Sequence, residues 1–374
     1  MAIINRGNKG ALSGTVVSVD ALTETIQFCT ANEEGSALIV ETADGSTVAY
    51  DKEFFEQLRD VVKQQIEKNP NMDLQKVSLL LPDRLFLIDT LTVPIIHRKA
   101  MQQSLSLAVE ALYQNAEEMS LMTYSVQQNK QAVTFGLVGV RNEVLAQAKT
   151  AMSEAGAPVG NVTFASNAMV DGAMALNAKL KNDTFLLLDI KRSCARFAFV
   201  VRGCTMGYYD LPFGYGMLHK SHVVNEENLF NHRAAKQLVH VSKERARDKL
   251  TPEGIVVTTR AQTEDAAKAL KFMHRSTPLY EQEFVYENFR IFLKWAMELL
   301  NNNPDITSLA KVDTVYINMP DEYRFLFDLV SQKSEAGDVT FLPLLPEGSE
   351  VTFAENLELY GGFFMDRFNE ANTF

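Results

Sequence analysis

The sequence predicts an α/β fold made of two related lobes, and a repeated strand pattern is the main reason. Near the middle of the chain, the apolar run FLLLDI ends in Asp189, the chain turns, and two further strands follow. The same outline occurs near the N-terminus, where VVSVD ends in Asp20 and is followed by TIQFCTA and SALIVET. Bounded runs rich in β-branched and aromatic residues are typical of strands. We therefore interpret the chain as an internal duplication at domain scale.

Composition places the chain among globular proteins, because 46% of its 374 residues are hydrophobic and 22% are charged. The formal net charge of -11 disfavours nucleic acid and anionic membrane surfaces as partners. No signal peptide and no apolar run near the ~20 residues of a membrane span is visible. Because Cys29, Cys194 and Cys204 form no C-x-x-C pair, we expect small buried thiols in a cytoplasmic protein.

The first lobe begins with three strands, expected at 15–20, 25–31 and 37–41. A helix at 51–68 follows, which starts at a capping aspartate and stops before an Asn-Pro pair. The next strand, at 77–81, is continuously apolar, as expected for a strand that is buried on both faces. These elements make up one copy of the repeated pattern.

Residues 83–163 change character and predict a small α+β subdomain inserted in the first lobe. The segment has a β-α-β-β-α-β pattern. Its elements, in order, are FLIDTLTV, a helix at 97–115, TYSVQQ, AVTFGLVGV, a helix at 141–155, and NVTF. Because the three-strand pattern resumes afterwards, we place the first lobe at 1–82 and 164–181 and the second lobe at 182–374.

The second lobe repeats the order of the first. A helix of small residues at 167–181 leads into it, and three strands follow between 184 and 211. The later elements are helices between 225 and 250, a long helix at 281–303, a strand at 312–318, a helix at 321–332, a strand at 339–342 and a terminal helix from about Gly361. The chain thus contains two copies of the order strand-strand-strand-helix-strand, and the insertion interrupts the first copy.

Four segments carry a resemblance to a known family. They are VSLLLPDRLFLIDTLTVP, VTFGLVGVRNEVLAQAKTAMSEAGAPVGNVTF, FLLLDIKRSCARFAFVVRG with LPFGYGML, and ENFRIFLKWAMELLNN with VDTVYIN. In this order they resemble the actin-like (ribonuclease H-like) nucleotide-binding fold, in which two α/β lobes enclose a cleft. Within that group the chain most resembles the PilM-type proteins of type IV pilus assembly, which are relatives of the cell-division protein FtsA.

The resemblance implies a nucleotide site at the two strand-end turns, but both turns depart from the family pattern. Members that bind ATP have Asp-x-Gly at the first turn, where glycine lets the backbone approach a phosphate closely. This chain has Asp20-Ala21-Leu22-Thr23 there, and the second turn runs from Asp189 through Lys191 to Ser193. Asp20, Thr23, Asp189, Lys191 and Ser193 remain candidate cofactor-binding residues.

The other nucleotide elements are partly kept. The turn at Gly214 and Gly216 survives, and Lys236 is the one candidate left in the helix that reaches the base in the family. The Gly-Gly turn expected after the late strand is replaced by a segment that begins with Asn318 and Met319 and continues with a proline, which lacks an N–H donor. Three of the four elements are altered, which favours a pocket that no longer holds ATP tightly.

Alternatives stay open for the charged candidates. Asp20 and Asp189 are the candidate metal residues, as oxygen ligands of hydrated Mg²⁺, or they are turn formers that bond local backbone N–H groups. Lys191 and Arg192 are more simply solvated than bound to an anion. The pair His219 and His222 lacks a third metal-ligand pattern.

We therefore expect a non-catalytic, actin-like cytoplasmic scaffold of a type IV pilus-like or type II secretion-like machine, with no cofactor. The resemblance implies recruitment to the inner face of the membrane by the cytoplasmic tail of a PilN-like inner-membrane protein, with membrane association through partners only and no nucleic acid. Self-association stays open. One alternative is an ATPase of the same machine that uses ATP and Mg²⁺ to couple lobe closure to assembly. The others are an FtsA-like division scaffold and an actin-fold phosphotransferase.

Overall fold

The structure is a computed structural model. It describes residues 12–20, 25–31, 38–44, 53–113, 115–128, 130–211, 214–218, 285–286, 289–290, 293, 312–320, 323, 325–326, 339–345 and 354–364. The helices expected between 225 and 250 lie outside these ranges, and those expected at 281–303 and 321–332 lie mostly outside them. No helix within the described ranges is both long and apolar enough to cross a bilayer.

The chain divides into two compact units. Unit 1 consists of Met1–Thr184, Ala198–Tyr208 and Leu345–Phe374, and unit 2 consists of Phe185–Phe197 and Tyr209–Leu344. This division differs in detail from the boundaries expected from the sequence, which remain a prediction.

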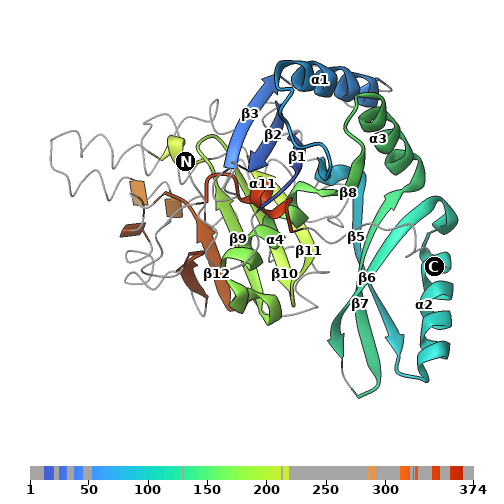
Figure 1. Ribbon diagram of the computed structural model, residues 1–374. Coiled ribbons are helices and arrows are strands. Elements are labelled where there is room, and N and C mark those ends of the chain that lie inside the picture. Colours follow the sequence, from blue (N-terminus) through green and yellow to red (C-terminus); the bar gives the residue numbers. More distant parts are fainter. Residues whose placement is uncertain are drawn as a thin grey trace, which may run out of the picture. The chain divides into compact units, whose positions relative to one another are not determined.

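The first sheet has five strands in the order β3-β2-β1-β4-β8 (Figure 1). They are β1 (Thr15–Asp20), β2 (Thr25–Ala31), β3 (Leu38–Asp44), β4 (Val77–Leu81) and β8 (Val159–Phe164). β1 pairs antiparallel with β2 and parallel with β4, which in turn pairs parallel with β8. Every residue of β1 and β4 is buried, which explains their continuous apolar character.

The second sheet repeats this arrangement. Its five strands have the order β11-β10-β9-β12-β13. They are β9 (Thr184–Ile190), β10 (Ala195–Val201), β11 (Cys204–Leu211), β12 (Thr314–Asn318) and β13 (Thr340–Pro343). β12 pairs parallel with both β9 and β13. In each sheet the order is third, second, first, fourth and fifth strand, so the predicted duplication is confirmed.

The duplication extends to the turn after the fourth strand of each sheet. A Pro-Asp pair follows both strands, beginning at Pro82 after β4 and at Pro320 after β12. Three residues later, the backbone N–H of Leu85 donates to the Pro82 carbonyl at 3.0 Å, and that of Tyr323 donates to the Pro320 carbonyl at 3.0 Å. The first of these turns is the 3-10 helix η1 (Asp83–Leu85). The same backbone hydrogen bond therefore follows the fourth strand in both copies.

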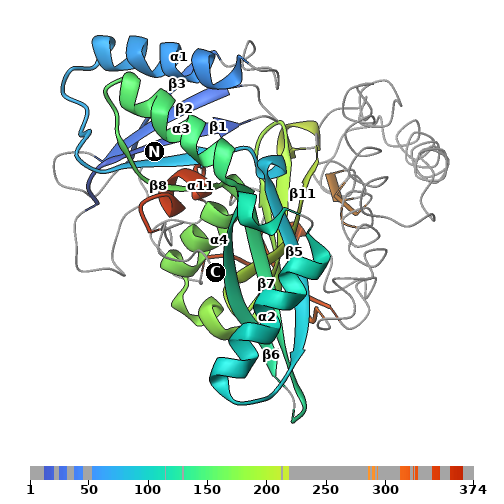
Figure 2. The same cartoon turned by 90° about the vertical axis from the view of Figure 1, so that its right-hand side faces the viewer.

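Helices α1 (Phe54–Lys68) and α3 (Asn142–Glu154) lie side by side over one face of the first sheet (Figure 2). Their buried side chains, including Leu58 and Met152, join the core formed by β1, β4 and β8. Burial of these apolar groups is the main term that holds the helices on the sheet.

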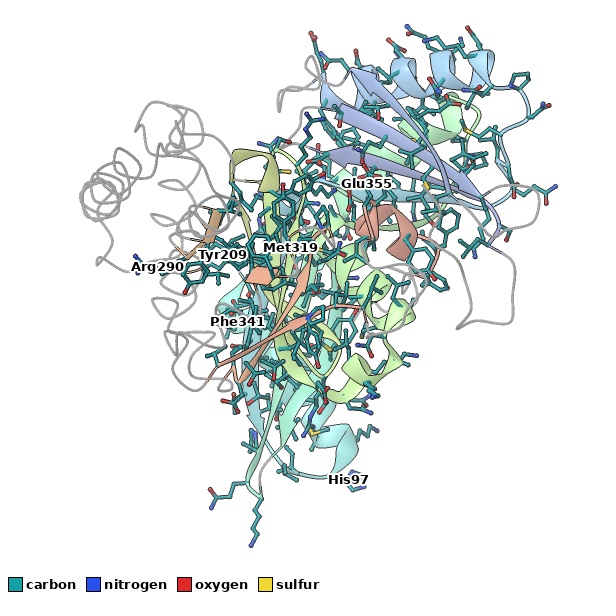
Figure 3. The ribbon with its side chains drawn as sticks, turned by 90° about the vertical axis from the view of Figure 1, so that its left-hand side faces the viewer. His97, Tyr209, Arg290, Met319, Phe341 and Glu355 are labelled. Carbon is teal, nitrogen blue, oxygen red and sulfur yellow. The ribbon has the colours of Figure 1, made fainter. Side chains whose placement is uncertain are left out.

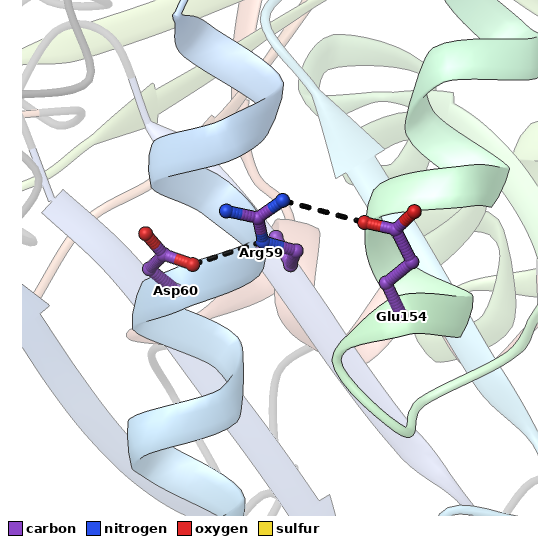
Figure 4. A network of polar contacts seen from close by, with 3 residues as sticks. All are labelled: Arg59, Asp60 and Glu154. Carbon is purple, nitrogen blue, oxygen red and sulfur yellow. Dashed lines mark hydrogen bonds and ion pairs between the residues drawn. The ribbon is translucent and has the colours of Figure 1, made fainter.

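A surface contact also links the two helices (Figure 4). Arg59 of α1 donates from Nη1 to Glu154 of α3 at 3.3 Å and from Nε to its neighbour Asp60 at 2.9 Å. The hydrogen bond to Asp60, followed by that to Glu154, raises the pKa of the Arg59 guanidinium above its usual value. All three side chains are substantially exposed, so screening by water makes this contact a minor contribution to stability.

The inserted unit contains a three-stranded sheet in the order β5-β7-β6. Its elements are β5 (Phe86–Pro94), α2 (Arg98–Leu112), the 3-10 helix η2 (Ala116–Glu118), β6 (Met119–Gln128) and β7 (Ala132–Arg141). Leu105 and Val109 of α2 pack with Leu91 and Leu137 in a small separate core. The expected α+β insertion is therefore present.

The insertion ends earlier than the sequence pattern suggested. The segment 83–163 was expected to contribute a closing helix and strand to the inserted unit. Instead, β8 pairs with β4 in the first sheet, and α3 packs beside α1. Because a short apolar strand carries no local information about its pairing partner, the pattern alone did not distinguish the two sheets.

Two helices cross closely on the other face of the first sheet: α4 (Ala165–Leu176) and α11 (Leu357–Gly361). A Cβ added at Gly361 would lie 1.7 Å from the carbonyl oxygen of Ala168, and one added at Gly172 would lie 2.4 Å from that of Leu357. Only glycine permits this backbone contact. The sequence predicts a terminal helix that begins near Gly361, whereas the described helix ends at this glycine, which lies at the crossing.

The helix expected at 167–181 is also divided. α4 ends at Leu176, and a 3-10 helix, η3 (Ala178–Asn182), follows it. The side chain of Asn177 accepts a hydrogen bond from the backbone N–H of Lys179 at 3.3 Å at this break. Asparagine side chains compete with the helical backbone in this way, which accounts for the shorter helix.

Cys29 lies beneath the crossing of α4 and α11. It packs with Val16, Leu80 and Leu359. Burial, with a smaller effect of the nearby Glu358 carboxylate, raises the pKa of the Cys29 thiol to about 12. Of the three cysteines expected to be buried, Cys29 and Cys194 are buried, whereas Cys204 is partly exposed.

The substitution Gly361→Ala tests the helix crossing. Because the new methyl group would overlap the Ala168 carbonyl, we expect the free energy of unfolding to fall by about 1–3 kcal/mol, measured by urea denaturation. Gly160→Ala is the matched control, since its Cβ would approach only the Val77 carbonyl, at 3.7 Å. Equal stability of the two variants would contradict the close crossing.

Candidate functional site

The structure brings most of the predicted site residues of unit 2 together. They are Asp189, Lys191, Ser193, Gly214, Gly216 and Asn318, and they lie at the ends of β9 and β12 and in the turns beside them. Asp20 lies in unit 1. Thr23 and Lys236 lie outside the described residues.

Asp189 and Asn318 form a buried pair at the centre of the second sheet. They are the last paired residues of the parallel strands β9 and β12. Nδ2 of Asn318 donates to Oδ1 of Asp189 at 2.7 Å, and the exposed fractions of Asp189 and Asn318 are 0% and 1%. A buried carboxylate needs hydrogen-bond donors to offset its lost hydration. The Asn318 amide is therefore a donor that stabilises this buried carboxylate.

The second strand-end turn packs against the surviving glycine turn. The backbone N–H of Tyr215 donates to the Lys191 carbonyl at 2.9 Å, and that of Gly216 donates to the Arg192 carbonyl at 2.9 Å. A Cβ added at Gly214 would lie 2.4 Å from the Lys191 carbonyl oxygen. The two glycines thus permit contact between two backbone segments. The N–H groups of Tyr215 and Gly216 are used within the protein and are not directed at a ligand.

The charged side chains of this turn are in contact with solvent. Arg192 and Ser193 are exposed, and Lys191 is partly buried. The backbone N–H of Lys191 donates to the Cys194 carbonyl at 2.8 Å, which closes the turn. The exposure of Arg192 agrees with its interpretation as a solvated turn residue, whereas Lys191 is only partly exposed.

Large side chains occupy the region that follows Asn318. Met319 is only 4% exposed; Figure 3 labels it at the end of β12. The rings of Tyr215 and Tyr323 contact each other, with centroids 5.5 Å apart and an angle of 42° between their planes. A Gly-Gly turn at this point would leave space, whereas methionine and the tyrosine pair fill it.

Asp20 lies at the end of β1 in a row of buried polar residues. It is 4% exposed, and strand alternation places it on the same face as Ser18. Ser18 is paired across the strands with Gln27, and among the described residues the buried atoms Ser18 Oγ and Gln27 Oε1 have no hydrogen-bond partner. Within the described ranges, no group of three or more histidine, cysteine or acidic residues lies close enough to hold a metal.

The sequence interpretation missed Asp83, a buried carboxylate with a clear structural role. Its Oδ1 accepts from the backbone N–H of Ser166 at 2.8 Å, and its Oδ2 accepts from the Ser166 hydroxyl at 2.7 Å. Ser166 lies in the first turn of α4, where a negative charge complements the helix dipole. The Pro-Asp pair after an apolar strand was the available signal.

Arg84, the residue after Asp83, is also partly buried. Burial lowers the pKa of the Arg84 guanidinium to about 9, while Tyr208 of β11 acts in the opposite direction. Tyr208 also contacts Phe164 in an aromatic pair with a centroid distance of 6.2 Å. The start of the inserted unit therefore packs on the end of β8 and on β11.

Comparison with solved structures identifies the fold. The chain is similar to a chain of the "PilM-PilN type IV pilus biogenesis complex", with a TM-score of 0.52 and 12% identity over 96% of this chain and 100% of that chain. Together with the identical strand orders of the two sheets, this likeness shows an actin-like, duplicated two-lobe fold, as the sequence predicted. No protein-family profile and no curated protein matches the sequence.

Two further structures are similar at lower scores. The cytoplasmic domain of EpsL, an inner-membrane component of the type II secretion system of Vibrio cholerae, has a TM-score of 0.36 and 14% identity over 58% of this chain and 76% of that chain. MreB 5 of Spiroplasma citri bound to AMPPNP has a TM-score of 0.38 and 12% identity over 93% of this chain and 94% of that chain. At these scores neither likeness bears on the fold.

Two substitutions test the Asp189–Asn318 pair. Asn318→Ala removes the amide donor from a buried carboxylate, so we expect the free energy of unfolding to fall by about 1–3 kcal/mol. Asn318→Asp places a second carboxylate beside the first, so we expect a larger loss at pH 8 than at pH 4, where one of the two is protonated. Urea denaturation at both pH values measures this difference. A pH-independent effect of Asn318→Asp would contradict the pairing.

Proposed function

We propose that this chain is a non-catalytic, actin-like scaffold of a type IV pilus-like or type II secretion-like assembly machine at the inner face of the cell membrane. The observation that carries the proposal is the structural likeness to a chain of a PilM-PilN complex over 96% of this chain, a share too large to leave out the inserted sheet. Many functions use the actin-like fold, so the proposal depends on this particular combination of lobes and insertion.

The proposed partner is the cytoplasmic tail of a PilN-like inner-membrane protein. The likeness to one chain of a complex that contains such a partner supports this choice. β5 and β6 are the outer strands of the three-stranded sheet. An extended peptide binds well to such an edge, because backbone hydrogen bonds supply affinity and pockets for alternate side chains supply selectivity. We place the tail beside the inserted unit and assign no individual groove residues.

The proposed absence of turnover is supported by the geometry of the second strand-end turn. Its neighbouring N–H groups, those of Tyr215 and Gly216, are used by the Lys191 and Arg192 carbonyls. Met319 is buried where the family has glycine. These residues do not fit a triphosphate with Mg²⁺, so no catalytic step is assigned. The alternative is an ATPase that couples lobe closure to assembly. It is compatible with the strand-end acids Asp20 and Asp189, and it requires ATP to bind one conformation preferentially.

Thermal unfolding with and without Mg-ATP tests the nucleotide proposal. We expect no change in the unfolding temperature at millimolar ATP, because a ligand raises it only by binding the folded state. An actin-like protein with both Asp-x-Gly turns intact, measured in the same buffer, is the positive control. A rise of several degrees would contradict the proposal and favour the ATPase alternative.

The partner proposal is tested by affinity capture with the full chain from solubilised membranes of the native cell. We expect a small inner-membrane protein of a pilus or secretion machine, recovered by a segment that lies on the cytoplasmic side. Synthetic peptides of its cytoplasmic tail should then compete with the captured protein. Recovery of cell-division proteins in its place would favour the FtsA-like alternative.

A further inference from the structure

One end of the inserted unit carries an exposed apolar and basic surface, here called the tip patch. It consists of Pro94, Ile95, Ile96, Lys99 and Lys130, from the end of β5, the start of α2 and the turn between β6 and β7. Ile95 and Ile96 are 37% and 43% exposed, and Pro94, Lys99 and Lys130 are exposed as well. His97, labelled in Figure 3, marks this end of the sheet.

The patch is held together by the backbone. The N–H of Ile95 donates to the carbonyl of Gln131 at 2.8 Å, and Pro94 is paired with Ala132 across the strands. The β5–α2 connection is thereby fixed to the β6–β7 turn. The connection that carries the isoleucines therefore lies beside the turn that carries Lys130.

The charge of this region is opposite to that of the chain. Residues 90–109 and 119–140 contain Arg98, Lys99 and Lys130 and no acidic residue, which gives a formal charge of +3, whereas the chain carries -11. The acidic residues of the insertion lie toward its other end. They are Asp83, Asp89, Glu110, Glu117 and Glu118. Exposed isoleucines on a surface that also carries Lys99 and Lys130 complement a partner with an anionic surface and an apolar layer beneath it.

The start of α2 adds to this electrostatic preference. Its N-cap residue, His97, makes no side-chain cap, and the first turn contains Arg98 and Lys99 and no acidic residue. Cations near a helix N-terminus are opposed by the helix dipole, and an anion beside them is favoured by both. The N-terminus of α2 therefore adds to the preference of this surface for anions, and it is not a binding site by itself.

We propose that the tip patch binds the surface of a bilayer that contains anionic lipids. Ile95 and Ile96 enter the interfacial layer, and Lys99 and Lys130 contact phosphate groups, a combination of apolar burial and charge that membrane-surface segments use. The isoleucines favour a lipid surface over an acidic protein, because an interfacial layer accepts protruding side chains without a matching pocket.

Two isoleucines and two lysines give weak binding on their own. The contact therefore adds to recruitment by a membrane-anchored partner and goes beyond the expectation that membrane association occurs through partners only. It does not depend on the identity of that partner. A second, weak contact on the same membrane raises overall affinity through effective concentration.

Vesicle flotation of the full chain tests the proposal. We expect binding to vesicles that contain one-third phosphatidylglycerol and none to vesicles of phosphatidylcholine alone. Binding should be lost in about 1 M salt, where the screening length falls to about 3 Å. Absence of binding to the anionic vesicles at low salt would overturn the proposal.

Two double variants locate the contact. Lys99→Glu with Lys130→Glu, and separately Ile95→Ser with Ile96→Ser, should each lower the vesicle partition coefficient at least ~10-fold. Lys63→Glu with Lys68→Glu is the matched charge control, since both lysines are exposed on α1 outside the patch. Leu107→Ser, at a side chain that is 66% exposed on α2, is the apolar control. Unchanged unfolding temperatures establish that all variants are folded.

Three outcomes are informative. Loss in the two tip variants alone supports the proposal. Equal loss in the controls would show that binding depends only on net charge or on general apolarity. That result would overturn the proposal. Binding of soluble polyglutamate, sensitive to the tip variants, together with no binding to anionic vesicles, would assign the patch to an acidic protein and would overturn it as well.

Discussion

Parallel pairing at the centre of each five-stranded sheet is the constraint on which the rest of the structure depends. β4 pairs with β1, and β12 pairs with β9. In the second sheet this pairing sets Asn318 opposite Asp189, so a buried carboxylate meets its amide donor at 2.7 Å. The strand ends are therefore fixed by backbone hydrogen bonds, which also determine where the following turns begin.

The two copies keep the same frame, and each contains a buried acid with a hydrogen-bonded partner. In the first, the carboxylate after the fourth strand, Asp83, holds the first turn of α4 through Ser166. In the second, the carboxylate at the end of the first strand, Asp189, is bonded to Asn318. Both acids stabilise the frame. Buried charges of this kind are stable only when donors are in place.

Much of the fold was predictable from local sequence. β1, β2 and β4 have the predicted bounds, because turn residues flank their apolar runs. The role of Gly361 and the sheet to which β8 belongs were not predictable, because both depend on contacts between distant segments. At the site, the sequence indicated Asp189 and Asn318 as candidates, but the bond between them and the use of neighbouring N–H groups by carbonyls are non-local.

The proposed loss of nucleotide binding rests on the claim that the backbone N–H groups of Tyr215 and Gly216 in the glycine turn are already hydrogen-bonded within the protein. Hydrogen–deuterium exchange of the Tyr215 and Gly216 amides tests it most directly, because both donate to carbonyls of the turn at 2.9 Å. We expect slow exchange that is the same with and without Mg-ATP. Fast exchange of these amides that becomes slow when Mg-ATP is added would contradict the account.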